Sequence, residues 1–81
     1  MASVRITVIN KYLPAAVAVY VHRNVDISDF DEIDYCAEES CGRYLNAYRD
    51  QLFAVNPELD WETIAAACEY LIEEDEYDTE F

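Results

Sequence analysis

The hydrophobic residues of this chain change their spacing once, after Asn24, and that change limits the folds open to it. Before it, the segments 4–9 and 16–22 alternate between apolar and other positions and are rich in β-branched residues, which is typical of strands. The alternation places Val17, Val19 and Val21 on one side of the second segment and Ala18, Tyr20 and His22 on the other. Residues 10–15 contain Pro14, which rarely lies inside a paired strand, so the first 25 residues predict a β-hairpin.

After Asn24 the apolar residues recur at helical spacing. Asp29 or Ser28 suits the N-cap of a helix, and Asp31 and Glu32 suit the positive end of its dipole. The apolar stripe that follows is Ile33, Ala37, Cys41, Tyr44, Leu45, Tyr48 and Leu52. This spacing predicts one helix of about 22 to 25 residues, ended near Pro57.

A second helix is expected after Asp60, which is a good N-cap. Its apolar stripe is Trp61, Ile64, Ala65, Cys68, Leu71 and Ile72. The predicted fold is therefore α+β in the order ββαα, one domain over residues 1–81. It consists of a hairpin (1–25), two antiparallel helices (26–72) and an acidic tail (73–81). Because a lone hairpin is marginal in water, the helices must cover it, or a second copy must extend the sheet.

The charged residues of the chain are also distributed differently before and after residue 25. All eighteen acidic residues follow Val25, whereas three of the five basic residues precede it. The first 25 residues therefore carry +3 and the rest carry −16, which gives the net charge of −13. Acids that only maintain solubility should be spread over every exposed face. The division instead predicts a surface that a positively charged partner recognises.

Size and composition narrow the class of protein. Eighty-one residues make one small domain, and a hydrophobic content of 53% is too high for a disordered chain. No targeting segment is expected, and the longest apolar stretch, 13–21, is too short to span a membrane. The acidity argues against direct binding to nucleic acid or to an anionic membrane, because both are negatively charged.

The three cysteines, Cys36, Cys41 and Cys68, are an odd number and favour a reducing cytoplasm over a disulfide framework. With His22 they contain the residue types of a zinc site. However, Cys36 and Cys41 are five residues apart and point to different faces of a helix. Packing of the cysteines in the core is expected instead.

Calcium binding and catalysis are also disfavoured by the spacing of the residues. An EF-hand loop that begins at Asp26 needs glycine at its sixth position and glutamate at its twelfth, where this chain has Asp31 and Ala37. The sequence has no glycine-rich phosphate loop, no pair of histidines at metal-binding spacing and no nucleophile elbow. His22 has no evident serine or cysteine partner. We therefore expect no metal, no cofactor and no enzymatic activity.

Two runs of acidic residues form the candidate partner-binding surface. Helical residues four apart are displaced by roughly 6 Å along the axis, comparable to the phosphate spacing of one DNA strand. Asp34 and Glu38 fit such a row, as do Glu62, Glu69, Glu73 and Glu76. The first group expected to contact a partner is Asp29, Asp31, Glu32, Asp34, Glu38 and Glu39. The second is Glu73, Glu74, Asp75, Glu76 and Asp78, and Tyr77 and Phe81 among these acids are candidate anchors.

In its size, its charge, its acidic runs at 26–39 and 73–80 and its lack of catalytic motifs, the chain resembles in kind the small acidic proteins of bacteriophages. These include DNA-mimic anti-restriction proteins and some anti-CRISPR proteins, which evade host defence. The resemblance implies a non-catalytic inhibitor that occupies the DNA- or guide-binding site of a nuclease complex in the bacterial cytoplasm. The chain departs from the extreme mimics in its neutral-to-basic hairpin, so its charge need not surround the molecule.

Two other functions use the same features. An immunity or antitoxin protein would steer acidic helices onto a basic nuclease toxin. Tyr44, Tyr48 and Tyr70 would then be interface anchors, unless they line the core. A halophilic protein would use its acids to hold water, which fits the single lysine but not the absence of acids before Asp26. The chain is expected to act as a monomer or a homodimer.

Overall fold

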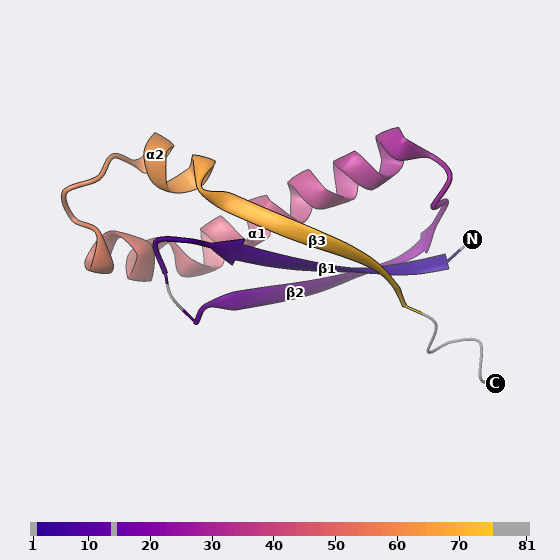
Figure 1. The fold of residues 1–81 in the computed structure, drawn as a ribbon, viewed down its shortest axis with the longest axis horizontal. Coiled ribbons are helices and arrows are strands. Elements are labelled where there is room, and N and C mark those ends of the chain that lie inside the picture. The colour runs from indigo at the N-terminus through magenta and orange to yellow at the C-terminus, as the bar shows by residue number, and fades with distance from the viewer. Residues whose placement is uncertain (1, 14, 76–81) are drawn as a thin grey trace.

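The computed structural model describes residues 2–13 and 15–75, which form a three-stranded antiparallel sheet and two helices (Figure 1). In chain order the elements are β1 (Ala2–Asn10), β2 (Val17–Val25), α1 (Phe30–Val55), α2 (Trp61–Ala66) and β3 (Cys68–Asp75). β1 is the central strand, between β2 and β3. The predicted α+β class and the predicted hairpin are confirmed, but the order of elements is ββααβ and not ββαα.

The long helix α1 covers one face of the sheet, and the alternation of the strands selects the residues that face it. Ile6 is fully buried at the centre of β1, opposite Tyr20 of β2 and Ile72 of β3. From the helix, Tyr44 and Leu52 are also fully buried. The other face of the sheet has no helix over it among the described residues, and its apolar side chains remain partly exposed (Figure 1).

One extra residue near the end of β2 turns the side chain of Val25 toward α1. Ala2 pairs with Val25 but Val4 pairs with His22, so three steps along β2 match two along β1. Asn24 takes a φ of 60° at this point, a left-handed conformation that asparagine tolerates better than most residues. Without this bulge Val25 would point away from α1, whereas it is only 3% exposed.

The helix α1 begins and ends close to where the sequence predicts. The Asp29 side chain accepts hydrogen bonds from the backbone amides of Asp31 and Glu32 at 3.1 and 3.2 Å, so the predicted N-cap is confirmed. The helix is 26 residues long, slightly longer than predicted. At its other end, the Asn56 backbone amide donates to the Leu52 carbonyl at 3.1 Å, and the chain leaves the helix before Pro57.

The predicted second helix is wrong beyond its first six residues. Asp60 does cap it, because its side chain accepts from the Thr63 amide at 2.9 Å. However, α2 ends at Ala66, and residues 68–75 form the strand β3. The predicted acidic tail is also corrected where the structure describes it, since residues 73–75 belong to β3. Residues 76–81 lie outside the described part of the chain.

Long-range contacts explain why β3 is a strand. In a longer helix the Ile64 carbonyl would accept from the Cys68 amide, but here it accepts from the Ala67 amide at 3.2 Å and from the Asn10 side-chain amide at 2.8 Å. In a helix Glu69 and Glu73 would be repelling neighbours at i and i+4. In the strand Glu73 lies opposite Arg5, and eight residues of β1 gain a pairing partner. These tertiary interactions override a helical pattern that is local.

Candidate partner-binding surface

The first residues of the two acidic runs, far apart in sequence, lie at the same end of the sheet. Ala2 pairs with Val25 on one side of β1, and Val4 pairs with Glu74 on the other. The residues that lead into α1 and the last residues of β3 therefore flank the start of β1 (Figure 1). We call this region the acidic end. Its exposed acidic residues are Asp26, Asp29, Asp31, Asp34, Glu73 and Glu74.

An apolar pocket of about 220 Å³ opens at the acidic end, between α1 and the sheet. Its lining is Val4, Ile27, Phe30, Ile33, Ile72 and Glu74. Phe30 has 79% of its surface exposed and Ile27 has 47%. The only acidic residue in the lining is Glu74. The surface therefore combines a concave apolar centre with an anionic surround.

Some acids of this end hold the start of α1 in place. Glu32 accepts a hydrogen bond from the Asp26 backbone amide at 3.1 Å, while Asp29 caps the helix. Asp26 accepts from both the hydroxyl and the amide of Ser28, at 2.6 and 3.0 Å. The hydroxyl bond is the main reason why the pKa of Asp26 lies below its ordinary value. These bonds fix the position of the carboxylates, and the two bonds from Ser28 favour the charged form of Asp26.

Three predicted contact residues on α1 have carboxylates with no such internal role. Asp31, Asp34 and Glu38 are exposed and, among the described residues, make no side-chain hydrogen bond or ion pair. They occur at i, i+3 and i+7, which places them along one side of the helix, with steps of about 4.5 and 6 Å along its axis. They are the part of the first predicted group that is most available to a partner.

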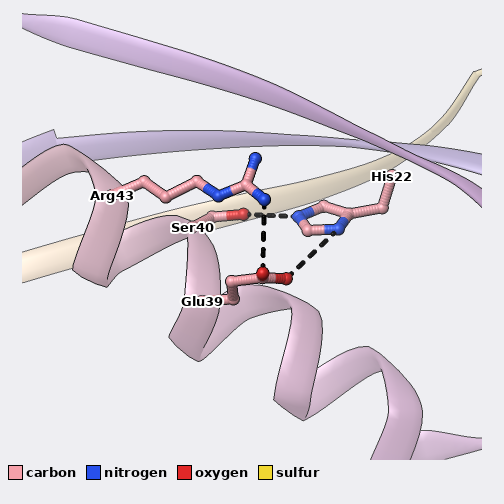
Figure 2. A network of polar contacts seen from close by, with 4 residues as sticks. All are labelled: His22, Glu39, Ser40 and Arg43. Carbon is pink, nitrogen blue, oxygen red and sulfur yellow. Dashed lines mark hydrogen bonds and ion pairs between the residues drawn. The ribbon is translucent and has the colours of Figure 1, made fainter.

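Glu39 differs from these neighbours because its carboxylate turns toward β2. Figure 2 shows its two oxygens near Arg43 and His22, at 3.2 Å from the Arg43 Nη2 atom and 3.8 Å from the His22 Nδ1 atom. The Nε2 atom of the same histidine is 2.8 Å from the Ser40 hydroxyl, so the expectation that His22 has no serine partner is wrong. The charge of Glu39 is therefore partly balanced within the chain, so we expect it to contribute less to a contact than Asp31.

Ser40, His22 and Glu39 are the residue types of a hydrolase triad, but their placement gives them a structural role. The Ser40 side chain is fully buried, so its hydroxyl cannot reach a substrate. The distance of 3.8 Å between His22 and Glu39 is too long for a hydrogen bond. Arg43 lies over the Tyr20 ring at 5.9 Å. These side chains connect α1 to the face of β2 that is turned toward the helix.

The aromatic residues are divided between the core and the surface. Tyr44 is fully buried, and the Tyr48 ring packs on it with a centroid distance of 4.9 Å, so both line the core and are not anchors. Tyr70 is 44% exposed. The sequence prediction missed two more exposed aromatics, Phe30 and Tyr35. The exposure of Tyr35 could have been predicted from the sequence, because Tyr35 lies on the side of the helix opposite the apolar stripe. Phe30 continues the stripe, so only the structure shows that it is exposed.

The second predicted group is only partly described. Glu73 lies on the open face of the sheet and Glu74 on the face toward α1, in register with Arg5 and Val4. The backbone of Asp75 pairs with Ser3. The other residues of that group lie outside the described part of the chain; they are Glu76 and Asp78, together with the candidate anchors Tyr77 and Phe81.

Within residues 2–13 and 15–75, no group of three or more His, Cys, Asp or Glu residues is placed to hold a metal ion. Cys36 is buried while Cys41 and Cys68 are half-buried, which confirms the predicted packing of the cysteines. Burial raises the pKa of the Cys36 and Cys41 thiols. In the same residues no helix has both the length and the apolar character needed to cross a bilayer.

Comparison of the chain with protein-family models, with curated proteins and with solved structures found no match. Any conclusion about function therefore depends on the residues themselves. They provide an anionic end with an apolar pocket, an arrangement suited to binding a cationic protein surface.

Proposed function

We propose that the chain is a non-catalytic binding protein whose acidic end enters the cationic groove of a nucleic-acid-binding protein and takes the place of DNA or RNA. The observation that supports this most strongly is that Asp26 and Glu74, from the starts of two acidic runs distant in sequence, lie at the same end of the sheet. The target we propose is a bacterial defence nuclease complex, of the CRISPR–Cas or restriction type, in the cytoplasm of the host.

Electrostatic attraction supplies the long-range part of this binding. Proteins that bind DNA contact its phosphates through Lys and Arg side chains, which makes their affinity fall steeply as salt rises. Asp31, Asp34 and Glu38 offer carboxylates at intervals comparable to phosphates along one strand. Asp26 and Glu74 extend the anionic surface across the start of β1.

The apolar pocket supplies the short-range part. Interfaces usually place apolar or aromatic residues at the centre and polar residues at the rim. Phe30, Ile27 and the pocket beside them follow this plan, with Asp26, Asp29 and Glu74 around them. The exposed ring of Phe30 also suits stacking against an arginine of the groove.

A capture experiment tests the proposal. The full chain is immobilised, exposed to a bacterial lysate and eluted either with duplex DNA or with rising salt, and the eluted proteins are identified by mass spectrometry. We expect a nucleic-acid-binding protein that duplex DNA releases. We also expect the triple variant Asp31→Lys, Asp34→Lys and Glu38→Lys to capture much less of it, because the variant reverses the charge of the exposed row.

The matched control reverses three exposed acids away from the acidic end, with the same change in net charge: Asp50→Lys, Glu58→Lys and Glu62→Lys. This control should capture the protein as the wild type does. Equal capture by both triple variants would contradict the proposed surface. Failure of duplex DNA to release the captured protein would contradict the proposed mimicry.

The pocket also favours a second candidate function, that of an immunity protein for a nuclease toxin. A concave apolar site beside an exposed phenylalanine fits a protruding apolar side chain of a protein partner. In that case the captured protein would be a nuclease toxin, and its active site would bind the acidic end. The identity of the captured protein separates the two functions.

A further inference from the structure

The two edge strands of the sheet differ in a way that the proposed function does not require. β3 has four acidic residues among its eight, whereas β2 has none among its nine. Charged side chains on an edge strand prevent it from pairing with other strands. From this difference we infer that β2 is a homodimer interface, at which the β2 strands of two copies pair antiparallel.

The backbone of β2 is available for such pairing. It pairs with β1 on one side, and in the described part of the chain no helix or strand lies beyond its other side (Figure 1). The strand contains neither Lys nor Pro, the residues that commonly protect an edge. A second β2 strand offers the same row of amide and carbonyl groups in reverse, which is the self-complementarity that a two-fold axis requires.

The side chains of β2 also suit pairing with a second copy. Val17, Val19 and Val21 are 48%, 49% and 41% exposed on the face away from α1. A two-fold axis beside Val19 would place this residue opposite its own copy and Val17 opposite Val21 of the other copy. On the helix side, Ala18 would lie opposite Tyr20, a small residue against a large one. Apolar cross-strand pairs of this kind stabilise antiparallel sheets.

The distribution of charge selects a second copy over other occupants of this edge. A cationic partner would be attracted to β3 or to the acidic end, since β2 contains no acidic residue and carries the basic residue Arg23. Two chains of net charge −13 repel each other over most of their surfaces, but the proposed contact is centred on residues 17–21 of β2, which carry no charged side chain. Antiparallel pairing also places the two acidic ends at opposite ends of a six-stranded sheet, where they remain open to partners.

Sedimentation equilibrium of the full chain tests this interface with a matched pair of variants. Val19 and Leu71 both lie opposite Thr7, on the same open face, one on each edge strand. Wild type should form dimers in the micromolar range. Val19→Lys should raise the dissociation constant of the dimer at least about tenfold, because two ammonium groups would meet at the axis. Leu71→Lys makes the same change in charge and should leave the constant unchanged.

Hydrogen exchange on the wild type provides a measurement that does not depend on a variant. The alternate amides of β2 that do not bond to β1 should become protected as the protein concentration rises. A wild type that stays monomeric, or a Val19→Lys variant that is folded by circular dichroism and dimerises normally, would overturn the inference. Loss of the dimer in both variants would also overturn it, since that result indicates stacking of two open faces.

Discussion

The two ends of the sheet are held together differently. At the end away from the acidic end, which we call the closed end, side chains join segments that are distant in sequence. The Asn10 side-chain amide donates to the Ile64 carbonyl at 2.8 Å, and that of Asn56 donates to the Tyr12 carbonyl at 2.9 Å. At the acidic end, the side-chain hydrogen bonds of Asp26 and its neighbours on the helix start span no more than six residues.

Aromatic side chains show the same contrast. At the closed end, the Phe53 and Trp61 rings pack with a centroid distance of 5.1 Å, and the Arg49 guanidinium lies 4.6 Å from the Trp61 ring. At the acidic end, Phe30 and Tyr35 are 79% and 66% exposed. The closed end uses its large side chains for folding, whereas the acidic end leaves them accessible. The accessible side chains of the acidic end support the proposed partner-binding surface, and the following changes test this comparison.

The largest effect on stability is expected at the closed end. Asn10 is only 1% exposed, and its side chain bonds the Ile64 carbonyl, the Tyr12 amide and the Cys68 sulfur. Asn10→Ala should lower the free energy of unfolding by about 2 to 3 kcal/mol, because it leaves buried polar groups without partners. Urea denaturation measures this. The control Asn46→Ala, at an exposed position of α1, should change it by less than about 0.5 kcal/mol.

A smaller effect is expected at the helix start of the acidic end. Asp29→Ala should cost about 1 kcal/mol, because the Asp31 and Glu32 amides lose their acceptor. Asp29→Asn removes the charge but keeps a capping oxygen, so the helix should lose only a few tenths of a kcal/mol. Equal destabilisation by both variants would show that the charge, and not the cap, is what stabilises the helix.

Phe30→Ala should affect stability even less, by under about 0.5 kcal/mol, because the ring is largely exposed. It should nevertheless weaken partner binding about tenfold, since the ring lies at the apolar pocket. Tyr35→Ala is the matched control, because Tyr35 is exposed on α1 but does not line the pocket. Equal loss of affinity in both variants would remove the pocket from the proposed interface.

The smallest effects are expected from two exposed carboxylates, one at each end. Hydrogen bonds from Ser28 and Thr63 lower the pKa of Asp26 and of Asp60 in the folded chain. Each ionised group therefore favours folding above its ordinary pKa, and this contribution is lost as the pH falls through the lowered value. Asp26→Asn and Asp60→Asn should each reduce the fall in unfolding temperature between neutral pH and about pH 3. A larger fall in either variant would contradict the assigned bonds.

Patterns that are local in sequence could be predicted, and those that depend on distant contacts could not. The hairpin and α1 follow from alternation, from helical spacing and from Asp29 as a cap. β3 could not be predicted because its apolar residues, among them Leu71 and Ile72, also fit a helical stripe. The segment forms a strand because of its contact with Asn10 and its pairing with the side of β1 that β2 does not occupy.

The candidate site shows the same limit. The charge of the first acidic run and its position at a helix start could be predicted from the sequence alone. The pocket could not, because Ile27, Ile33 and Ile72 come together only when β3 pairs with β1. The internal contacts of Glu39 with Arg43 and His22 likewise depend on how α1 lies against β2.

The most direct test of the central claim is the salt dependence of affinity for the captured protein. The measurement compares the wild type, the acidic-end variant (Asp31→Lys, Asp34→Lys and Glu38→Lys) and the matched control that reverses Asp50, Glu58 and Glu62. We predict that affinity falls steeply with salt for the wild type and the control, and that the acidic-end variant binds weakly at every salt concentration. Binding of the acidic-end variant with the affinity and salt dependence of the wild type would contradict the account.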